Sequence, residues 1–399
     1  HNGKEIMGRD PETNILISIF REQFLKFNNY AIDLDVEREL NNIKIELDQN
    51  DLGRAFYNRI VSNSGPTYID WENPENNTFH LALEVTCQNG GDEFRPDIVI
   101  FINGLPLSYI EVKQPNAIRD GKTAIQSEQS RTAVRFENRR FRRFNNITQL
   151  LSFSDNLPYI SGQGQQKQGS FYCSNAFSKT KFNAFKEERE EELIYSIRSL
   201  GEEKIDAVLK DVNRFALKSQ PEFKTNQDPS TPCNTFISSL YQKERLLFLL
   251  RYGLAYVEEH TKDGTIQLQK HVMRYPQFFA TKAIEDAIGK GVKKGVIWHT
   301  QGSGKTALSY FNIRYLTNYF SKQEIVPQFY FVVDRLDLAD QATREFTKRG
   351  LKVKRINRPQ ELNEKHDAYQ VAVVNIQKFK DNSDLTDHSG YDLDRKSNV

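Results

Sequence analysis

The segment at residues 295–306 constrains the fold and chemistry of this chain more than any other. Its sequence, GVIWHTQGSGKT, leads from a short apolar stretch into a glycine-rich loop, and a helical pattern with Leu308 and Phe311 follows. Backbone N–H groups in such a loop can surround a polyphosphate, while the positive end of the helix dipole faces it. The segment therefore predicts a strand, a phosphate-binding P-loop and a helix.

The residues of this loop have separate expected roles. We expect Lys305 to reach the β- and γ-phosphate oxygens and the Thr306 hydroxyl to ligate Mg²⁺. The usual pattern opens with glycine, whereas this chain has His299 there. A glycine-rich turn that binds nothing is the alternative, but a Gly-Lys-Thr run at a strand-to-helix switch favours a nucleotide site. The predicted cradle consists of Gly302, Ser303, Gly304, Lys305 and Thr306.

Composition excludes several classes of protein. Mean hydropathy is −0.65 and no apolar run approaches membrane-spanning length, so we expect no membrane association. The three cysteines are far apart and the seven histidines are scattered, which argues against a disulfide framework or structural zinc and fits a reducing cytoplasm. Net charge is only +2, so any nucleic-acid binding must come from local patches.

The order of segments predicts two domains. Residues 1–218 mix helical segments with short alternating strands, and the polar, proline-containing stretch 219–234 is the predicted linker. A helical pattern at 236–257 comes next, and strands then alternate with helices, which is typical of a parallel sheet covered on both faces. The expected strands are 296–298, 328–333, 351–356 and 371–375, and the expected helices are 305–319 and 336–349.

A second motif lies in the first domain. The sequence RPDIVIFINGLPLSYIEVK at 95–113 predicts a β-hairpin with a turn at Asn103-Gly104. Asp97, Glu111 and Lys113 match the PD…ExK pattern of Mg²⁺-dependent nucleases. Two carboxylates can hold a cation that activates water, and an ammonium group can stabilise charge on the scissile phosphate.

A shared metal ion places a condition on the hairpin. A strict two-residue turn would pair Ile102 with Leu105 and put Asp97 and Glu111 on opposite faces. We therefore predict an odd-length loop or a bulge in one strand.

The hairpin's position is what makes its acidic residues informative. Glu-x-Lys also occurs at 202–204 and 222–224, in a charged helical stretch and in the predicted linker, where neither has an acidic strand beside it. A solvated hairpin end with an ordinary Glu/Lys pair remains the alternative.

Taken together, these motifs and their order resemble the restriction (motor) subunit of type I restriction enzymes. The P-loop segment 298–306 is close to that family's own version. Residues 331–341 are similar to helicase motif Ia, and 375–379 to the next block. The segment HVMRYPQ at 271–277 resembles the family's adenine-recognition segment, in which Arg274 and Gln277 would contact the base. An ordinary helix start is the alternative for these two residues.

The resemblance implies an N-terminal PD-(D/E)xK nuclease domain (1–218), with a mixed sheet flanked by helices, and a first RecA-like helicase lobe (235–399). Such a subunit uses ATP and Mg²⁺ to pump duplex DNA and cleaves unmodified foreign DNA, together with methyltransferase and specificity subunits, in a bacterial or archaeal cytoplasm. Asp97 and Glu111 would bind Mg²⁺, with Lys113 completing the nuclease site. Gln126 or Gln129 could supply the family's additional glutamine, which stays open.

The family's Asp-Glu-x-His box should follow residues 375–379, but the sequence ends at Val399 without it. We expect this polypeptide to bind ATP and to hydrolyse it very slowly. Two alternatives remain: a nuclease-helicase of DNA repair, or a non-catalytic nucleotide-binding module that docks on a modification complex.

A basic run at 135–144, RFENRRFRRF, interleaves cations with aromatic residues. It could contact DNA phosphates, in which case neutralising Arg139, Arg140, Arg142 and Arg143 should flatten the salt dependence of DNA binding. The alternative is an amphipathic helix with its phenylalanines in the core.

Overall fold

The computed structural model divides the chain into two compact units. The first comprises His1–Arg251 and Gln269–Val272, and the second Tyr252–Leu268 and Met273–Val399. The residues that the structure describes are 8–89, 92–119, 121–159, 168–177, 180–189, 193, 200–260, 263–300, 302–358, 360–361 and 369–379. None of the helices formed by these residues combines the length and the apolar composition needed to span a membrane.

The predicted linker at 219–234 lies within the first unit, because the division between units falls at Arg251/Tyr252. It contains the helix α8 (Pro221–Thr225) and the start of α9 (Pro232–Leu240). Both helices begin with proline, whose fixed φ and missing N–H suit the first helical position. The prolines that suggested a linker are therefore helix-start signals.

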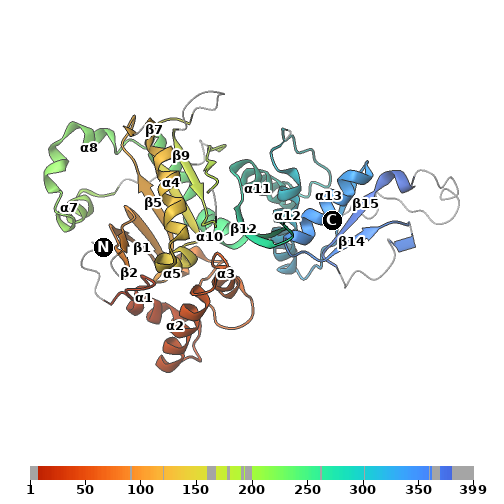
Figure 1. Ribbon diagram of the computed structural model, residues 1–399, viewed down its shortest axis with the longest axis horizontal. Helices are drawn as coiled ribbons and strands as arrows, with labels where there is room; N and C mark the ends of the chain where they lie inside the picture. The colour runs from red at the N-terminus through yellow and green to blue at the C-terminus, as the bar shows by residue number, and fades with distance from the viewer. Residues whose placement is uncertain are drawn as a thin grey trace. The chain divides into compact units, whose positions relative to one another are not determined.

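The first unit is built on a six-stranded mixed sheet in the order β1-β4-β5-β8-β9-β10 (Figure 1). Neighbouring strands are antiparallel except β5 and β8, which are parallel. A parallel pair needs a crossover, which α4 (Ala124–Glu137) and α5 (Arg142–Ile147) supply. The predicted mixed sheet flanked by helices is confirmed. The strands are β1 (Phe79–Leu83), β4 (Ile98–Ile102), β5 (Leu105–Val112), β8 (Leu150–Ser154), β9 (Ser170–Cys173) and β10 (Asn183–Ala184).

The core of this unit forms where the central strands meet the helices. Seven of the eight residues of β5 are buried, as expected for a central strand covered on both faces. Phe94, Phe141 and Phe144 make edge-to-face contacts beside Tyr109 of β5. The other elements are α1 (Ile17–Phe27), α2 (Asp33–Leu47), α3 (Arg54–Val61), η1 (Pro74–Asn76), β2 (Cys87–Asn89), β3 (Asp92–Phe94), β6 (Ile118–Arg119), β7 (Lys122–Thr123), η2 (Arg139–Phe141), α7 (Glu202–Asp211), η3 (Phe215–Ser219) and α10 (Lys243–Tyr252).

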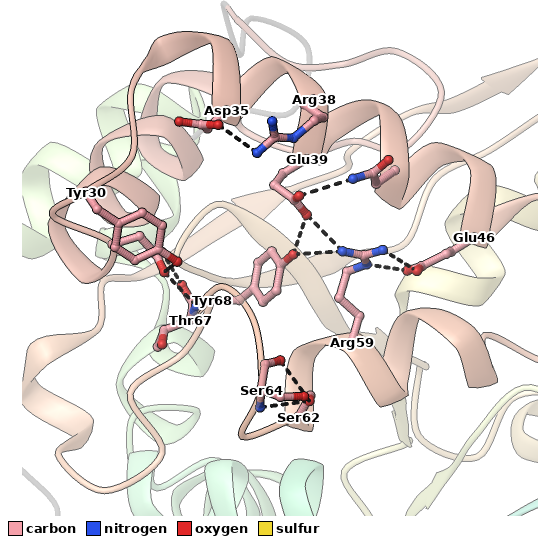
Figure 2. Close-up of polar contacts among 12 residues, drawn as sticks. Tyr30, Asp35, Arg38, Glu39, Glu46, Arg59, Ser62, Ser64, Thr67 and Tyr68 are labelled. Atoms are coloured by element: carbon pink, nitrogen blue, oxygen red, sulfur yellow. Dashed lines mark hydrogen bonds and ion pairs between the residues drawn. The ribbon is translucent and has the colours of Figure 1, made fainter.

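A polar cluster, Glu39, Glu46, Arg59 and Tyr68, connects α2 to α3; we call it the α2–α3 cluster (Figure 2). The Arg59 guanidinium donates to both oxygens of Glu46 at 2.6 and 2.7 Å and to Glu39 Oε2 at 2.9 Å. The Tyr68 hydroxyl donates to the same Glu39 oxygen at 2.6 Å. Hydrogen bonding to Glu46 raises the pKa of Arg59, and burial raises the pKa of Tyr68. Within the cluster, Arg59 therefore stays protonated and charged, and Tyr68 stays protonated and neutral.

The second unit contains a three-stranded parallel sheet in the order β13-β15-β14, which confirms the predicted parallel sheet for these strands. Ile356 of β14 and Ala372 and Val374 of β15 form an apolar cluster within this sheet. The elements are β11 (Leu254–His260), α11 (Tyr275–Gly289), α12 (Lys305–Ser321), β13 (Phe329–Val333), α13 (Leu336–Lys348), β14 (Val353–Ile356), β15 (Val371–Asn375) and η5 (Ile376–Phe379). The strand β12 (Ile266–Val272) begins in this unit, and its residues Gln269–Val272 belong to the first unit. Helices α12 and α13 follow the predicted pattern closely.

Two sequence predictions in this part are wrong. The segment Val296–Trp298 forms no strand, and Val296 is 92% exposed and Trp298 91% exposed. A strand requires a neighbour for its backbone groups, and the described sheet does not pair with this segment. The predicted helix 236–257 is divided between α9 and α10, and α10 ends at Tyr252, beyond which β11 begins. Buried Leu254, Ala255 and Val257 fit a strand there as well as a helix.

Candidate functional site

The hairpin formed by β4 and β5 contains the predicted bulge. Asn103 and Gly104 both have positive φ, 52° and 82°, and Ile102 pairs with Leu105, as in a two-residue turn. The register shifts between Ile100 and Phe101, whose partners are Ser108 and Pro106. The extra residue of β5 is Leu107, which has no partner on β4.

The bulge decides which acidic residues meet. Beyond it Ile98 pairs with Ile110, so the register continues to Asp97 opposite Glu111. Without the shift Asp97 would face Ile110 and the two carboxylates would lie on opposite faces. The predicted bulge is confirmed, and with it the condition for a shared site.

Asp97 is held at the end of the hairpin by backbone hydrogen bonds. Its Oδ2 accepts from the Val112 N–H at 2.7 Å, and its carbonyl accepts from the Glu84 N–H at 3.1 Å. The side chain is half-buried, so it remains reachable from solvent. These contacts orient the carboxylate beside the strand that carries Glu111.

Glu111 and Lys113 form the inner part of the site. Glu111 is 2% exposed, and its Oε2 lies 2.7 Å from Lys113 Nζ. Burial raises the pKa of Glu111, the nearby Glu128 carboxylate raises it further, and Lys113 and Arg135 act in the opposite sense. Burial disfavours the charge on Lys113, but the Glu111 and Glu128 carboxylates raise its pKa overall. Glu111 and Glu128 are thus matched by Lys113 and Arg135, and Asp97 adds a further carboxylate near Lys113.

Two members of this site were not predicted from the sequence. Glu128 and Arg135 both lie on α4, and Glu128 is fully buried. Arg135 Nη1 lies 2.9 Å from Glu128 Oε1 and 3.3 Å from Glu111 Oε1, while Lys113 Nζ lies 3.2 Å from Glu128 Oε2. We call Glu111, Lys113, Glu128 and Arg135 the hairpin cluster. The sequence pattern that could have identified Glu128 and Arg135 is the helical spacing of positions 125, 128, 132 and 135. This spacing puts both residues on the helix face that carries the buried Ile125 and Thr132.

The hairpin cluster leaves polar atoms without hydrogen bonds. Glu128 Oε2 forms ion pairs with Lys113 Nζ at 3.2 Å and Arg131 Nε at 3.6 Å but accepts no hydrogen bond from the described residues, and the buried Tyr109 hydroxyl donates none. Burial and the Glu111 charge raise the pKa of Tyr109, which keeps it protonated. Unsatisfied buried polar atoms are rare in proteins and are costly.

The carboxylates of Asp97 and Glu111 suit Mg²⁺. This ion is commonly held by one or two carboxylates together with water and substrate phosphates. The described residues contain no group of three or more His, Cys, Asp or Glu that could hold a metal by themselves. A pair of carboxylates open to solvent at Asp97 fits an ion that shares its coordination with a phosphate.

Gln126 and Gln129 already have partners within the fold. The Gln126 side chain accepts from the Thr123 N–H at 3.0 Å and completes the capping box of α4. Gln129 Nε2 donates to the Thr180 carbonyl at 2.5 Å. The question of a catalytic glutamine stays open.

The P-loop residues surround the start of α12. Gly302 and Gly304 have positive φ, 77° and 86°, and Gly304 is the N-cap of the helix. The exposed Lys305 ammonium donates to the carbonyls of His299 and Thr300 at 3.1 and 3.2 Å. Gln301 lies outside the described residues. The loop conformation therefore depends on glycine at the positions where the sequence has it.

Arg274 and Gln277 lie beside the P-loop, at the start of α11. Gln277 is 2% exposed, and its Nε2 donates to the Gly304 carbonyl at 3.0 Å while its Oε1 accepts from the Arg274 N–H at 2.9 Å. Arg274 Nη1 donates to the Gly302 carbonyl at 3.5 Å. A Cβ on Gly304 would stand 2.6 Å from Gln277 Nε2. These hydrogen bonds hold the P-loop next to the start of α11. Recognition of adenine by Arg274 and Gln277 stays a prediction.

The two segments resembling helicase motifs follow strands of the parallel sheet. Asp334 comes directly after β13, and the fully buried Asn375 ends β15. Because β13 and β15 are parallel, both residues lie at the same edge, where α/β sheets bind their ligands.

Both halves of the chain match known protein families. Residues 1–191 match the family described as type I restriction enzyme R protein N terminus. Residues 276–399 match the SWI2/SNF2 ATPase family. The two matches occur in the order in which the sequence motifs predicted them.

Individual relatives agree with these families. The putative type I restriction enzyme MjaVIIP endonuclease subunit of Methanocaldococcus jannaschii is 31% identical over 288 residues, 70% of this chain and 22% of the relative. The type I restriction enzyme HindI endonuclease subunit of Haemophilus influenzae is 26% identical over 289 residues, again 70% and 22%. The chain thus spans about a fifth of the length of these relatives. Its resemblance to the R subunits of type I restriction enzymes is confirmed.

Proposed function

We propose that this chain is the nuclease and first motor region of a type I restriction subunit that cleaves unmodified foreign duplex DNA. Its first unit would be a Mg²⁺-dependent PD-(D/E)xK endonuclease and its second an ATP-driven translocase lobe. The observation that carries the proposal is the β5 bulge, which aligns Asp97 with Glu111 beside Lys113. Bulges that re-aim side chains in this way are over-represented next to active sites.

In this proposal each side chain of the nuclease site has a separate task. Asp97 and Glu111 hold Mg²⁺, which when bound lowers the pKa of water and polarises the phosphate. Lys113, next to Glu111, places an ammonium group where charge develops on the scissile phosphate. Arg135 and Glu128 keep Lys113 and Glu111 in place from the α4 side.

The nucleotide site would work through the P-loop. Lys305 leaves the carbonyls of His299 and Thr300 to reach the phosphates, and the N-terminus of α12 faces their negative charge. Thr306 ligates Mg²⁺ with the nucleotide. Arg274 and Gln277 contact adenine from the adjoining helix. The SWI2/SNF2 ATPase match supports ATP as the nucleotide.

The partners follow from the relatives, which are named as endonuclease subunits. A subunit of this kind acts in a complex, and we propose methyltransferase and specificity subunits as its partners and duplex DNA as its substrate. Target recognition then lies outside this chain.

The test uses the full-length protein in the assembled restriction complex. We expect Asp97→Ala and Lys113→Ala to abolish DNA cleavage while ATP hydrolysis and DNA binding persist, because the P-loop lies in a separate unit. Cleavage at the wild-type rate by both variants would remove the nuclease assignment and favour a non-catalytic docking module.

A further inference from the structure

The basic run at 135–144 does not form one helix, and its arginines have different environments. It is divided among the end of α4, the turn η2 and the start of α5. Arg140 pairs with Asp92 at 3.3 Å, and Arg143 pairs with Asp48 at 2.7 Å and also with Glu12. Arg135 belongs to the hairpin cluster. These three cations are neutralised within the protein.

Arg139 and Arg142 instead line a cavity of about 200 Å³ in the first unit. Arg139 is exposed and pairs with no acidic side chain among the described residues, and Arg142 Nη1 donates only to the Asp48 carbonyl, at 3.1 Å. Phe136 and Phe177 contribute aromatic surface to the same cavity. Glu137 lines it as well, so the cavity combines two guanidinium groups with one carboxylate and aromatic side chains.

Two buried amides add oriented polar groups to this cavity. Asn145 is 5% exposed, its Nδ2 donates to the Arg135 carbonyl at 2.9 Å, and its Oδ1 accepts no hydrogen bond from the described residues. Asn175 is 2% exposed, and its Oδ1 accepts from Lys270 Nζ at 3.0 Å.

We propose that this cavity binds one nucleotide of the DNA strand on which the neighbouring nuclease site acts. The guanidinium groups of Arg139 and Arg142 take the phosphate, as arginine forks do. Phe136 and Phe177 contact the ring of the base. A bare phosphate would satisfy the arginines but not the aromatic surface. This inference rests on the proposed nuclease function.

Arg135 connects the cavity to the nuclease site. Its carbonyl accepts from Asn145 of the cavity, while its guanidinium lies 3.3 Å from Glu111. A DNA strand with one nucleotide in the cavity is thus held next to Asn145, which contacts Arg135 of the hairpin cluster. Such an anchor would position the scissile phosphate by holding the strand beside it.

The decisive experiment measures DNA affinity of the full-length protein by fluorescence anisotropy over a range of salt concentrations. Each neutralised phosphate contributes about 0.9 to the slope of log K against log salt, so the double variant Arg139→Ala/Arg142→Ala, which leaves the one phosphate in the cavity without a cation, should lower the magnitude of that slope by about one. The matched control Arg140→Ala, on the same turn but paired with Asp92, should leave it unchanged. An unchanged slope in the double variant, or an equal loss in the control, overturns the proposal.

Competition separates a nucleotide from a simple anion. A deoxynucleoside monophosphate should displace labelled DNA from the wild type at a lower concentration than inorganic phosphate does, and this advantage should vanish in Arg139→Ala/Arg142→Ala. Equal potency of the two competitors on the wild type would overturn the nucleotide assignment.

The two proposals fail separately. Lys113→Ala tests the nuclease function, since we expect it to abolish cleavage by the assembled complex. If Lys113→Ala cleaves DNA normally, the proposed function fails. If Lys113→Ala is inactive and the Arg139→Ala/Arg142→Ala slope is unchanged, only the nucleotide cavity fails.

Discussion

The first unit contains two clusters in which buried carboxylates meet cations, and they differ in how fully their atoms are satisfied. In the α2–α3 cluster, Arg59 and Tyr68 donate to Glu39 and Glu46, and no buried polar atom of these four residues lacks a hydrogen bond. In the hairpin cluster, Glu128 Oε2 accepts no hydrogen bond and the pKa of Glu111 is raised by burial and by Glu128.

An ion cluster whose buried polar atoms are all hydrogen-bonded stabilises the fold, whereas a cluster with unsatisfied acceptors can bind a ligand. A saturated network rigidifies its surroundings and gains nothing from a further cation. A network with unsatisfied acceptors and a carboxylate of raised pKa gains when a metal ion arrives, and perturbed carboxylates of this kind concentrate at functional sites.

The largest effect should come from Asp97→Asn. An amide keeps the size of the carboxylate, and its oxygen can still accept the Val112 N–H, so the fold should be retained. Loss of a metal-binding charge should lower the rate of DNA cleavage by on the order of 10³-fold, about 4 kcal/mol of transition-state stabilisation. A cleavage assay on the assembled complex, with urea unfolding as the check on stability, measures both. A loss of cleavage explained entirely by unfolding would contradict this prediction.

The next effect concerns the α2–α3 cluster. Arg59→Ala leaves Glu39 and Glu46 without their cation, and removing one partner from a buried pair costs about 3 kcal/mol. Urea unfolding should show this loss in the free energy of unfolding. The exposed pair of Arg38 and Asp35 supplies the control, because Arg38→Ala should cost less than about 1 kcal/mol. Equal losses in the two variants would mean that the α2–α3 cluster does not hold the fold.

The smallest effect is a pH dependence of stability. Since the pKa of Glu111 is raised in the folded protein, the native state holds this proton more tightly than the unfolded chain. As pH rises above 4.5, the ordinary value for glutamate, the free energy of unfolding of the wild type should fall relative to that of Glu111→Gln, until pH passes the folded pKa.

Urea unfolding of both proteins at a series of pH values, without metal, measures this difference. Added Mn²⁺ should restore stability to the wild type at the higher pH and leave Glu111→Gln unchanged. A difference that grows in favour of the wild type as pH rises would mean that the hairpin cluster stabilises the Glu111 charge.

Local chemistry made part of this molecule predictable. Asn103-Gly104 specifies a tight turn, and the alternation of side chains along β5 showed that Asp97 and Glu111 could meet only through an odd-length loop or a bulge. The glycines before Lys305 permit the positive φ values that the loop adopts. The parallel sheet followed from the alternation of apolar strands with helices.

The unpredicted features depend on contacts between distant segments. Glu128 enters the site because the crossover helix α4 packs beside β5, and a glutamate within a helical pattern gives no sign of that by itself. The arginines at 139–143 became distinguishable only when their partners, Asp48 and Asp92, were known. The segment Val296–Trp298 has an apolar composition typical of a strand, but strand formation also depends on a neighbour.

The most direct test of the contrast is the binding of Mn²⁺ to the full-length protein, measured by calorimetry without nucleotide. Glu111→Gln and Glu46→Gln make the same chemical change in the two clusters. We expect the wild type and Glu46→Gln to bind Mn²⁺ and Glu111→Gln not to bind it. Binding by Glu111→Gln with the wild-type affinity would contradict this expectation.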